Sequence, residues 1–278
     1  QKIEQQIEAG IYPGASFAYY QNGSWSDWYF GNSNPETGEK TREGLIYDLA
    51  SVTKVVGVGT VLTFLWQEGK LDIDEPISTY LPQATYPDIS IRQLLTHVTD
   101  LDPFIPNRDQ LTSDQLKEAM FHLQRREKRT FLYSDVHFLL LGFMLEVYFK
   151  KNLDQIFQEE VFDPWEMRDT KFGPVSDAVP TVRGQKAGVV HDPKARLLGK
   201  HAGSAGLFST VKDLKLFLEH YLQDDFADGL SQNFSDLSDK ERSLAWNLEG
   251  DWLDHTGYTG TFIMWNRKKQ EAAIFLSN

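Results

Sequence analysis

Ser51 and Lys54 are the two residues whose types and spacing point most directly to nucleophilic catalysis. They stand three positions apart at the start of an apolar segment, and positions i and i+3 share one face of a helix, so the hydroxyl and the amine can meet. A serine hydroxyl is a weak nucleophile until a base takes its proton, and a desolvated lysine can do so. A serine N-cap followed by a surface lysine gives the same pattern. Residues 55–58, however, are Val-Val-Gly-Val, which favours a buried lysine.

Two later segments carry groups that could act with this pair. Tyr133 precedes Ser134 and Asp135 at the start of a predicted helix, and a phenol there could share a proton with Lys54, first as base and then as acid. Residues 255–257 are His-Thr-Gly, where the glycine would let a substrate lie against a strand whose N–H groups bind an oxyanion. Taken singly, the first segment is also typical of a packing aromatic with a helix cap, and the second of a turn.

The elements that must position these groups can be read from periodicity. Apolar and aromatic runs at 15–20 and 24–30 flank an Asn-Gly pair, which predicts a hairpin, and the runs at 261–266 and 271–277 predict another. Helical periodicity predicts helices at 2–9, 51–66, 91–97, 112–124, 134–150, 153–161 and 210–221. Strands at both ends around a helical middle favour an α/β lobe built from both ends, plus a helical lobe.

Composition excludes several classes of function. The formal net charge of −12 and the absence of a basic stripe argue against a nucleic-acid partner. The chain has no cysteine, which excludes disulfides and thiol catalysis, and its seven histidines lack metal-ligand spacing. No apolar run reaches the length of about 18 residues that a membrane span needs. The chain opens at Gln1 rather than Met and shows no signal peptide, as expected of a mature or trimmed chain.

The order of the three motifs carries more information than any one of them. Ser-x-x-Lys, a Tyr-x-Asn-like triplet and His-Thr-Gly, in that order, resemble the signature of class C β-lactamases, D-alanyl-D-alanine carboxypeptidases and β-lactamase-like esterases. The resemblance runs over almost the whole chain. It includes Asp-Leu-Ala-Ser-Val-Thr-Lys at 48–54, the segment 67–77, Tyr-Leu-Pro at 80–82, Leu-Leu-Thr-His at 94–97, Val-His-Asp-Pro at 190–193 and Ala-Gly-Leu-Phe-Ser-Thr at 205–210.

The resemblance implies a β-lactamase/transpeptidase-like α/β (α+β) fold, in which helices flank a central antiparallel sheet beside an all-helical lobe. The active site would lie in the cleft between the two. Residues 1–54 and 186–278 would form the α/β lobe, and residues 55–185 the mainly helical lobe.

The resemblance also implies roles for individual residues. Ser51 would be the nucleophile, Lys54 its activating partner and Tyr133 the general acid–base. Asp135, His255, Thr256, Gly257 and Tyr258 would bind substrate, with the N–H groups of Ser51 and Tyr258 forming the oxyanion hole. No metal or organic cofactor is expected.

The chain departs from the family pattern at two of these positions. Asp135 stands where the family usually has Asn; a carboxylate can only accept hydrogen bonds, and its charge favours the ammonium form of Lys54. Either Tyr133 would then take over the proton transfer, or the reaction rate would be lower outright. An alternative register, with Ser134-Asp135-Val136 as a degraded Ser-Asp-Asn of class A enzymes, fits the rest of the chain worse. His255 replaces a lysine and would carry less positive charge at neutral pH.

The resemblance predicts a serine hydrolase that forms an acyl-enzyme at Ser51. The cell-wall-like stretch at 201–210 favours a penicillin-binding D-alanyl-D-alanine carboxypeptidase or peptidase acting on peptidoglycan peptides. The alternatives are a β-lactamase or esterase with the same site, or a catalytically weak module that binds peptidoglycan or β-lactams. We expect a monomeric, extracytoplasmic bacterial protein, in the cell envelope or secreted, with a small-molecule or peptide substrate.

Overall fold

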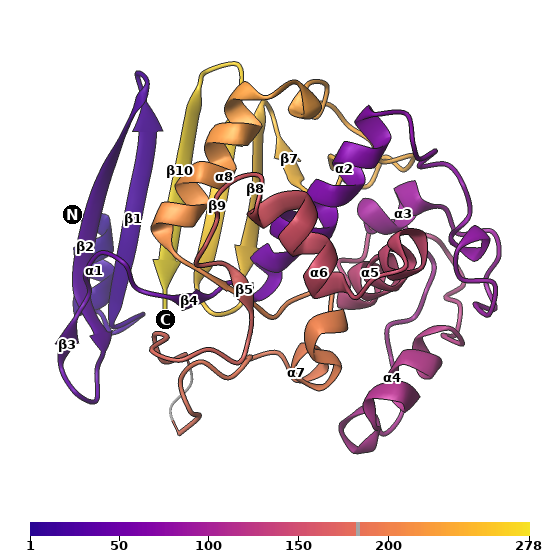
Figure 1. Ribbon diagram of the computed structural model, residues 1–278, viewed down its shortest axis with the longest axis horizontal. Coiled ribbons are helices and arrows are strands. Elements are labelled where there is room, and N and C mark those ends of the chain that lie inside the picture. Colours follow the sequence, from indigo (N-terminus) through magenta and orange to yellow (C-terminus); the bar gives the residue numbers. More distant parts are fainter. Residues whose placement is uncertain (182–183) are drawn as a thin grey trace.

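A seven-stranded antiparallel sheet dominates the computed structural model, which describes residues 1–181 and 184–278 (Figure 1). Its strand order is β3-β2-β1-β10-β9-β8-β7, so the two ends of the chain pair side by side at its centre. The strands are β1 (Gly14–Gln21), β2 (Ser24–Asn34), β3 (Glu39–Lys40), β7 (Asn247–Glu249), β8 (Trp252–Gly257), β9 (Thr261–Asn266) and β10 (Glu271–Ser277). The expected antiparallel sheet, built from both ends of the chain, is confirmed.

The first hairpin forms where the Asn-Gly pair predicted it. Gln21 pairs with Ser24, and the two residues between them, Asn22 and Gly23, both have positive φ. A two-residue turn of this kind matches the twist of the flanking strands and tolerates few residue types other than Asn and Gly. Local sequence therefore determines the register of β1 on β2.

Helices make up most of the middle of the chain. They are α1 (Lys2–Glu8), α2 (Thr60–Gln67), α3 (Ile91–Leu95), α4 (Ser113–Met120), α5 (Asp135–Phe149), α6 (Leu153–Phe157), α7 (Pro193–Leu198) and α8 (Val211–Gln223). Ser134 caps α5 by accepting the N–H of Val136, as predicted. Among the described residues, no helix is both long and apolar enough to cross a bilayer.

The segment 51–66, predicted as one helix, is helical throughout but is not a single α-helix. It consists of a 3-10 turn at Ala50–Val52, a π-turn at Val55–Gly59 and then α2. Ala50 has a positive φ of 48°, a strained conformation for a residue with a side chain. Periodicity could not reveal this change, because it arises where the segment packs against distant parts of the chain. The helix predicted at 153–161 likewise ends in a π-turn, at Gln158–Phe162.

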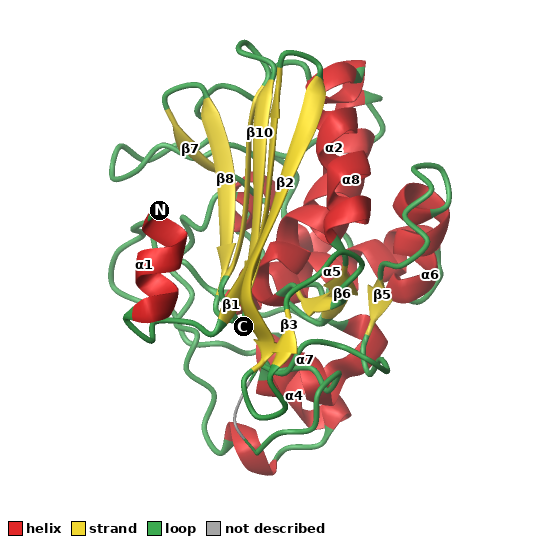
Figure 2. Ribbon diagram, turned by 90° about the vertical axis from the view of Figure 1, so that its left-hand side faces the viewer, coloured by secondary structure: helices red, strands yellow, loops and turns green. Residues whose placement is uncertain are grey.

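α8 packs against one face of the sheet, and α1 lies on the other side (Figure 2). The core beneath α8 is aromatic: Tyr221 stacks near Trp246 and Trp265, which are both fully buried. α5 is buried from Val136 to Leu145, as expected of a helix that is apolar on every side. The structure thus has the predicted helices around the sheet, while the division into lobes at 54/55 and 185/186 stays a prediction.

A second, three-stranded sheet connects the nucleophile segment to the late part of the chain. Its order is β4 (Tyr47–Asp48), β6 (Leu207–Ser209) and β5 (Lys171–Phe172). Leu49 donates its N–H to the Leu207 carbonyl, and Leu207 donates to the Thr53 hydroxyl. The strands are too short to show alternation, so sequence analysis missed this sheet. It holds residues 204–207 against the turn that carries Ser51.

Candidate active site

Ser51 and Lys54 lie within hydrogen-bonding distance of each other. Lys54 Nζ is 2.8 Å from Ser51 Oγ, and the Lys54 side chain is fully buried. The 3-10 turn and the π-turn that follows it keep both residues on the same side of the chain. This is the arrangement that the spacing predicted, and a surface lysine is excluded at this position.

The ammonium group of Lys54 has three oxygen partners. Besides Ser51 it donates to Asp135 Oδ1 at 2.8 Å and to the backbone carbonyl of Ser204 at 2.9 Å. An ammonium group has three donors, so every one of them is used. Burial acts to lower the pKa of Lys54, but Asp135 and Tyr133 together outweigh it, and the pKa is raised above its ordinary value. Lys54 is therefore held as a cation.

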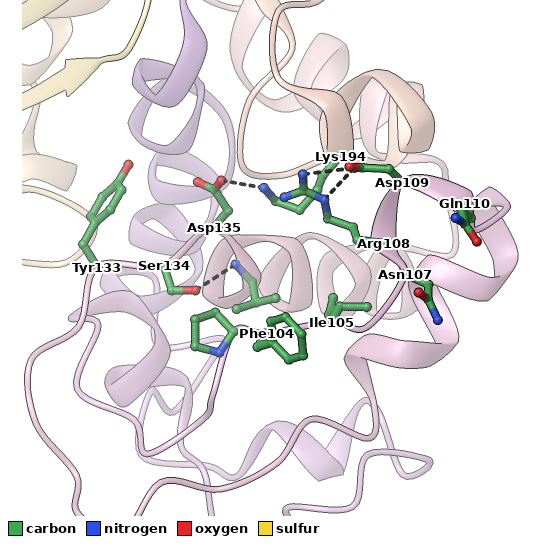
Figure 3. Close-up of a pocket in the computed structure, with 12 residues that line it drawn as sticks. Phe104, Ile105, Asn107, Arg108, Asp109, Gln110, Tyr133, Ser134, Asp135 and Lys194 are labelled. Carbon is green, nitrogen blue, oxygen red and sulfur yellow. Dashed lines mark hydrogen bonds and ion pairs between the residues drawn. The ribbon is translucent and has the colours of Figure 1, made fainter.

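Asp135 lies between two lysines. Its Oδ1 faces Lys54, and its Oδ2 is 3.2 Å from the Nζ of Lys194, the second residue of α7 (Figure 3). Burial acts to raise the pKa of Asp135, but the two ammonium groups outweigh it and lower the pKa to about 2. The carboxylate is ionised at neutral pH, and two cations balance its charge.

Tyr133 stands beside this cluster and is 41% exposed. Lys54 Nζ is 5.1 Å from the centre of its ring. His97 holds the segment on both sides of Tyr133: its carbonyl accepts the N–H of Leu132 at 2.9 Å, and its Nδ1 accepts the N–H of Ser134 at 3.3 Å. The rings of His97 and Tyr133 also pack at 4.7 Å. Tyr133 is thus accessible to a ligand while its backbone is fixed.

His255 is buried and lies 5.9 Å, ring to ring, from Tyr133. Its Nδ1 is 2.8 Å from the carbonyl of Thr256, so this nitrogen carries the proton. Burial, together with the charges of Lys54 and Arg242, lowers the pKa of His255 to about 3. The ring is therefore neutral at pH 7, and Nε2 accepts from no other described residue. The side chain of Thr256 is exposed, because successive residues of a strand point to opposite faces.

The end of β8 packs against the backbone of the Ser51 turn. A Cβ on Gly257 would lie 2.6 Å from the Leu49 carbonyl, so only glycine permits this approach. Thr259 and Thr261 donate their hydroxyls to the carbonyls of Asp48 and Leu49, at 2.8 and 2.9 Å. These bonds hold the backbone of Tyr258 beside the turn, while its ring, 87% exposed, stacks on His191.

A cleft of about 650 Å³ is lined by Tyr133, Asp135 and Lys194 of the candidate site. Tyr133 lies at one end, Asp135 and Lys194 lie in the middle, and Arg108 with Asp109 lies at the other end (Figure 3). Phe104 and Ile105 supply an apolar wall. The predicted residues Ser51, Lys54, Tyr133, Asp135 and His255 are thus brought together from three separate segments of the chain.

Comparison with known proteins identifies the family. The family model named Beta-lactamase matches residues 1–278. The chain belongs to the Beta-lactamase family. Members of this family are hydrolases. A relative from Escherichia coli O157:H7, named "Putative D-alanyl-D-alanine carboxypeptidase", is 27% identical over 99% of this chain and 80% of its own length.

Solved structures with low sequence identity share the fold. A β-lactamase/D-alanine carboxypeptidase from Pseudomonas syringae superposes with a TM-score of 0.80 at 17% identity, covering 99% of this chain and 91% of the other. EstCE1, a hydrolase with promiscuous acyltransferase activity, gives 0.82 at 18% identity, covering 100% and 92%. These likenesses confirm the predicted β-lactamase/transpeptidase-like fold of this Beta-lactamase family member.

Sequence analysis missed several residues that hold the site together. Asp48 is buried and accepts the N–H groups of Ala50 and His191, at 2.8 and 2.9 Å. Ser204 offers its carbonyl to Lys54 from within the family-like stretch at 201–210, which was the only signal for it. Nothing in the sequence indicated that Lys194 belongs to the site, since a lysine at the start of a short helix is common.

A buried histidine pair lies behind Tyr133. The two Nδ1 atoms of His97 and His137 are 2.8 Å apart, and Thr99 Oγ1 is 2.7 Å from His137 Nε2. Because His97 Nδ1 accepts from Ser134, His137 must be the donor of this pair. His201 is also paired within the protein, since its Nδ1 lies 2.6 Å from Glu146 Oε2.

Proposed function

We propose that this member of the Beta-lactamase family is a serine hydrolase that forms an acyl-enzyme at Ser51. The observation that carries the proposal is the 2.8 Å contact between Ser51 Oγ and the fully buried Nζ of Lys54. A buried cation beside a hydroxyl stabilises the alkoxide that forms as the proton leaves.

In the proposed reaction, Tyr133 reacts from its phenolate form, and the phenolate oxygen accepts the Ser51 proton as Oγ bonds to the substrate carbonyl carbon. Lys54 is poorly suited to be the base because Asp135 holds it as a cation. Tyr133 then gives the proton to the departing nitrogen or oxygen as its bond to the carbonyl carbon breaks. Water attacks the ester in the second half, which releases the acid and returns the proton to Ser51. The N–H groups of Ser51 and Tyr258 would bind the oxyanion.

We propose peptides ending in D-alanyl-D-alanine as the substrate class. The names of the relatives that align over nearly the whole chain support this assignment. With this substrate class we also propose a location outside the cytoplasm, in the bacterial cell envelope or secreted. β-Lactamase and esterase activities would use the same site, and they differ in leaving group rather than in the residues that form the acyl-enzyme.

A binding module with little turnover is the second candidate, and Asp135 is the observation that favours it. With both oxygens on lysines, the carboxylate fixes Lys54 as an ammonium group. Such a site would capture a ligand and react slowly. Measured turnover separates the two candidates: hydrolysis that disappears in Ser51→Ala favours the enzyme, and binding without turnover favours the module.

A fluorescent penicillin tests the proposed acylation of Ser51. We expect wild-type protein to retain the label through denaturing electrophoresis and Ser51→Ala to show none. Ser78→Ala removes a serine hydroxyl that lies outside the site and bonds to the Pro87 carbonyl at 3.1 Å, and it serves as a matched control that should still be labelled. Folded wild-type protein that takes no label from this probe or from activated esters would refute the proposal.

A further inference from the structure

Lys194 brings a positive charge into the cleft immediately beside the proposed reaction centre. Its side chain is 15% exposed, and it lines the cleft together with Tyr133, Asp135 and Phe104. Its Nζ is 3.2 Å from Asp135 Oδ2 and 3.7 Å from Asp192 Oδ2. Only the first of these distances is within hydrogen-bonding range. An ammonium group has three donors, so Lys194 keeps donors that can serve a ligand.

The other charged groups of the cleft are paired with one another or with neighbouring lysines. Both oxygens of Asp135 face lysines, and Arg108 is paired with Asp109 at 3.0 Å. All three donors of Lys54 are used by Ser51, Asp135 and Ser204. Lys194 is therefore the cationic donor that a ligand next to Asp135 would meet.

The position of Lys194 is fixed relative to Ser51. Asp192 caps α7 by accepting the N–H of Ala195 at 2.8 Å. One residue earlier, the N–H of His191 bonds to one oxygen of Asp48, whose other oxygen accepts the N–H of Ala50. The buried carboxylate of Asp48 thus joins the start of α7 to the turn that carries the nucleophile. A donor on such a scaffold can act with defined geometry.

Charge balance indicates what kind of oxygen Lys194 would bind. Lys54 and Lys194 carry two positive charges, and Asp135 and Asp192 carry two negative charges, so the cluster is neutral as a whole. A neutral carbonyl oxygen suits such a donor better than a second carboxylate would. Tyr133, which must face the leaving group, lies at one end of the cleft, and Lys194 lies beyond Asp135 (Figure 3). The part of the substrate that reaches Lys194 therefore belongs to the acyl portion.

We propose that Lys194 is a substrate-binding residue whose ammonium group, held by Asp135, donates a hydrogen bond to the carbonyl of an acylamino group on the acyl portion of the substrate. This inference rests on the proposed acyl-enzyme chemistry at Ser51. It assigns to the site a preference for peptide-like acyl donors over simple acids. The pair formed by Asp135 and Lys194 supplies both an acceptor for Lys54 and a donor for the substrate.

Two matched esters test this assignment. The p-nitrophenyl esters of N-acetyl-D-alanine and of propionic acid share the leaving group and the acyl carbon chain, and differ only in the acetamido group. We expect wild-type protein to prefer the acetamido ester in kcat/KM by about tenfold or more. In Lys194→Met, kcat/KM for this ester should fall about 10- to 100-fold, the range of a hydrogen bond to a charged group. The value for the propionate ester should change less than about threefold.

Two further variants sharpen the comparison. Lys194→Gln keeps an N–H donor without the charge and should retain part of the preference. Lys215→Met removes a comparably buried lysine whose partner is Asp27, at 2.5 Å, and should leave both esters unaffected. Turnover of the propionate ester shows that each variant is folded.

The outcomes separate this inference from the proposed function. Wild-type protein without a preference for the acetamido ester, or an equal loss on both esters in Lys194→Met, would overturn the role of Lys194 while leaving Ser51 chemistry intact. Unchanged turnover in Ser51→Ala would instead overturn the proposed function.

Discussion

The Nζ of Lys54 lies 2.8 Å from the Oδ1 of Asp135, and the lysine has no exposed surface. The chain thus places a buried salt bridge directly behind its candidate nucleophile. Burying two charges is costly, and such a pair is tolerated only when each group has further partners. Here Ser51 and Ser204 accept the other two hydrogen bonds of the Lys54 ammonium group, and Lys194 pairs with the second oxygen of Asp135. The stability of the pair and the chemistry proposed for Ser51 are therefore linked.

Removing the ammonium group of Lys54 should abolish most of the acylation of Ser51. Lys54→Met keeps an unbranched side chain, one atom shorter, but takes the positive charge away from Ser51 Oγ. We expect the rate of acyl-enzyme formation to fall by roughly 1000-fold, within the range found for groups that handle the reacting proton. Stopped-flow release of p-nitrophenol measures this rate, with Lys215→Met as the control. A folded Lys54→Met variant with near wild-type acylation would contradict the proposed role.

The proposed proton transfer through Tyr133 predicts a dependence on the leaving group. Tyr133→Phe should lower kcat/KM by about 100-fold for a substrate with a basic leaving group, such as an amide or an alkyl ester. The loss should be smaller for p-nitrophenyl esters, because p-nitrophenolate departs without a proton. Tyr19→Phe, which removes a hydroxyl bonded to Glu271 at 2.8 Å, should change neither. An equal loss on both kinds of substrate would argue against proton donation by Tyr133.

The lowered pKa of Asp135 predicts how its contribution to stability depends on pH. Its pKa is about 2 in the folded protein against an ordinary value of 3.8. The carboxylate therefore stabilises the fold above about pH 4, and this contribution is lost as pH falls toward 2. The shift corresponds to about 2 kcal/mol. Urea unfolding should show Asp135→Asn less stable than wild type at pH 5, with the gap narrowing toward pH 2.5. A gap that does not change with pH would contradict this account.

Three buried histidines predict a second loss of stability on acidification, which begins at a higher pH than the loss caused by Asp135. Burial lowers the pKa of His97, His137 and His255, in the last two to about 3. Their unfolded pKa is near 6.5, so the unfolded chain binds more protons below that value. The free energy of unfolding should then fall between about pH 6.5 and 5, by up to about 1.4 kcal/mol per pH unit for each histidine.

Two variants test whether the buried histidines cause this dependence of the free energy of unfolding on pH. His137→Gln should make the fall in the free energy of unfolding shallower by about one proton. His122→Gln alters an exposed histidine and should leave the slope unchanged. Equal slopes in all three proteins would show that the buried histidines do not cause the acid sensitivity.

Local patterns predicted the parts of the structure that local rules determine. The Asn-Gly pair fixed the first hairpin, Ser134 fixed the start of α5, and the spacing of Ser51 and Lys54 predicted their contact. Each of these features depends on residues a few positions apart. The positions of Tyr133 and His255 in the site followed from resemblance rather than from any local rule.

The parts that were missed depend on contacts between distant segments. The π-turn at Val55–Gly59 forms where Gly57 packs on the ring of Phe157, and no periodicity encodes it. Lys194 reaches Asp135 only because Asp48 ties the start of α7 to the Ser51 turn. Sequence analysis recognised that Asp135 departs from the family pattern. It could not show that a second lysine balances the charge.

Mass spectrometry of the trapped acyl-enzyme tests the central claim most directly. Protein is incubated with benzylpenicillin and with p-nitrophenyl N-acetyl-D-alaninate, quenched in acid and digested. We predict that at least one donor adds the mass of its acyl group to the peptide that carries Ser51, and that Ser51→Ala gains no such mass. An adduct located on another residue, or hydrolysis of either donor by folded Ser51→Ala at the wild-type rate, would contradict the account.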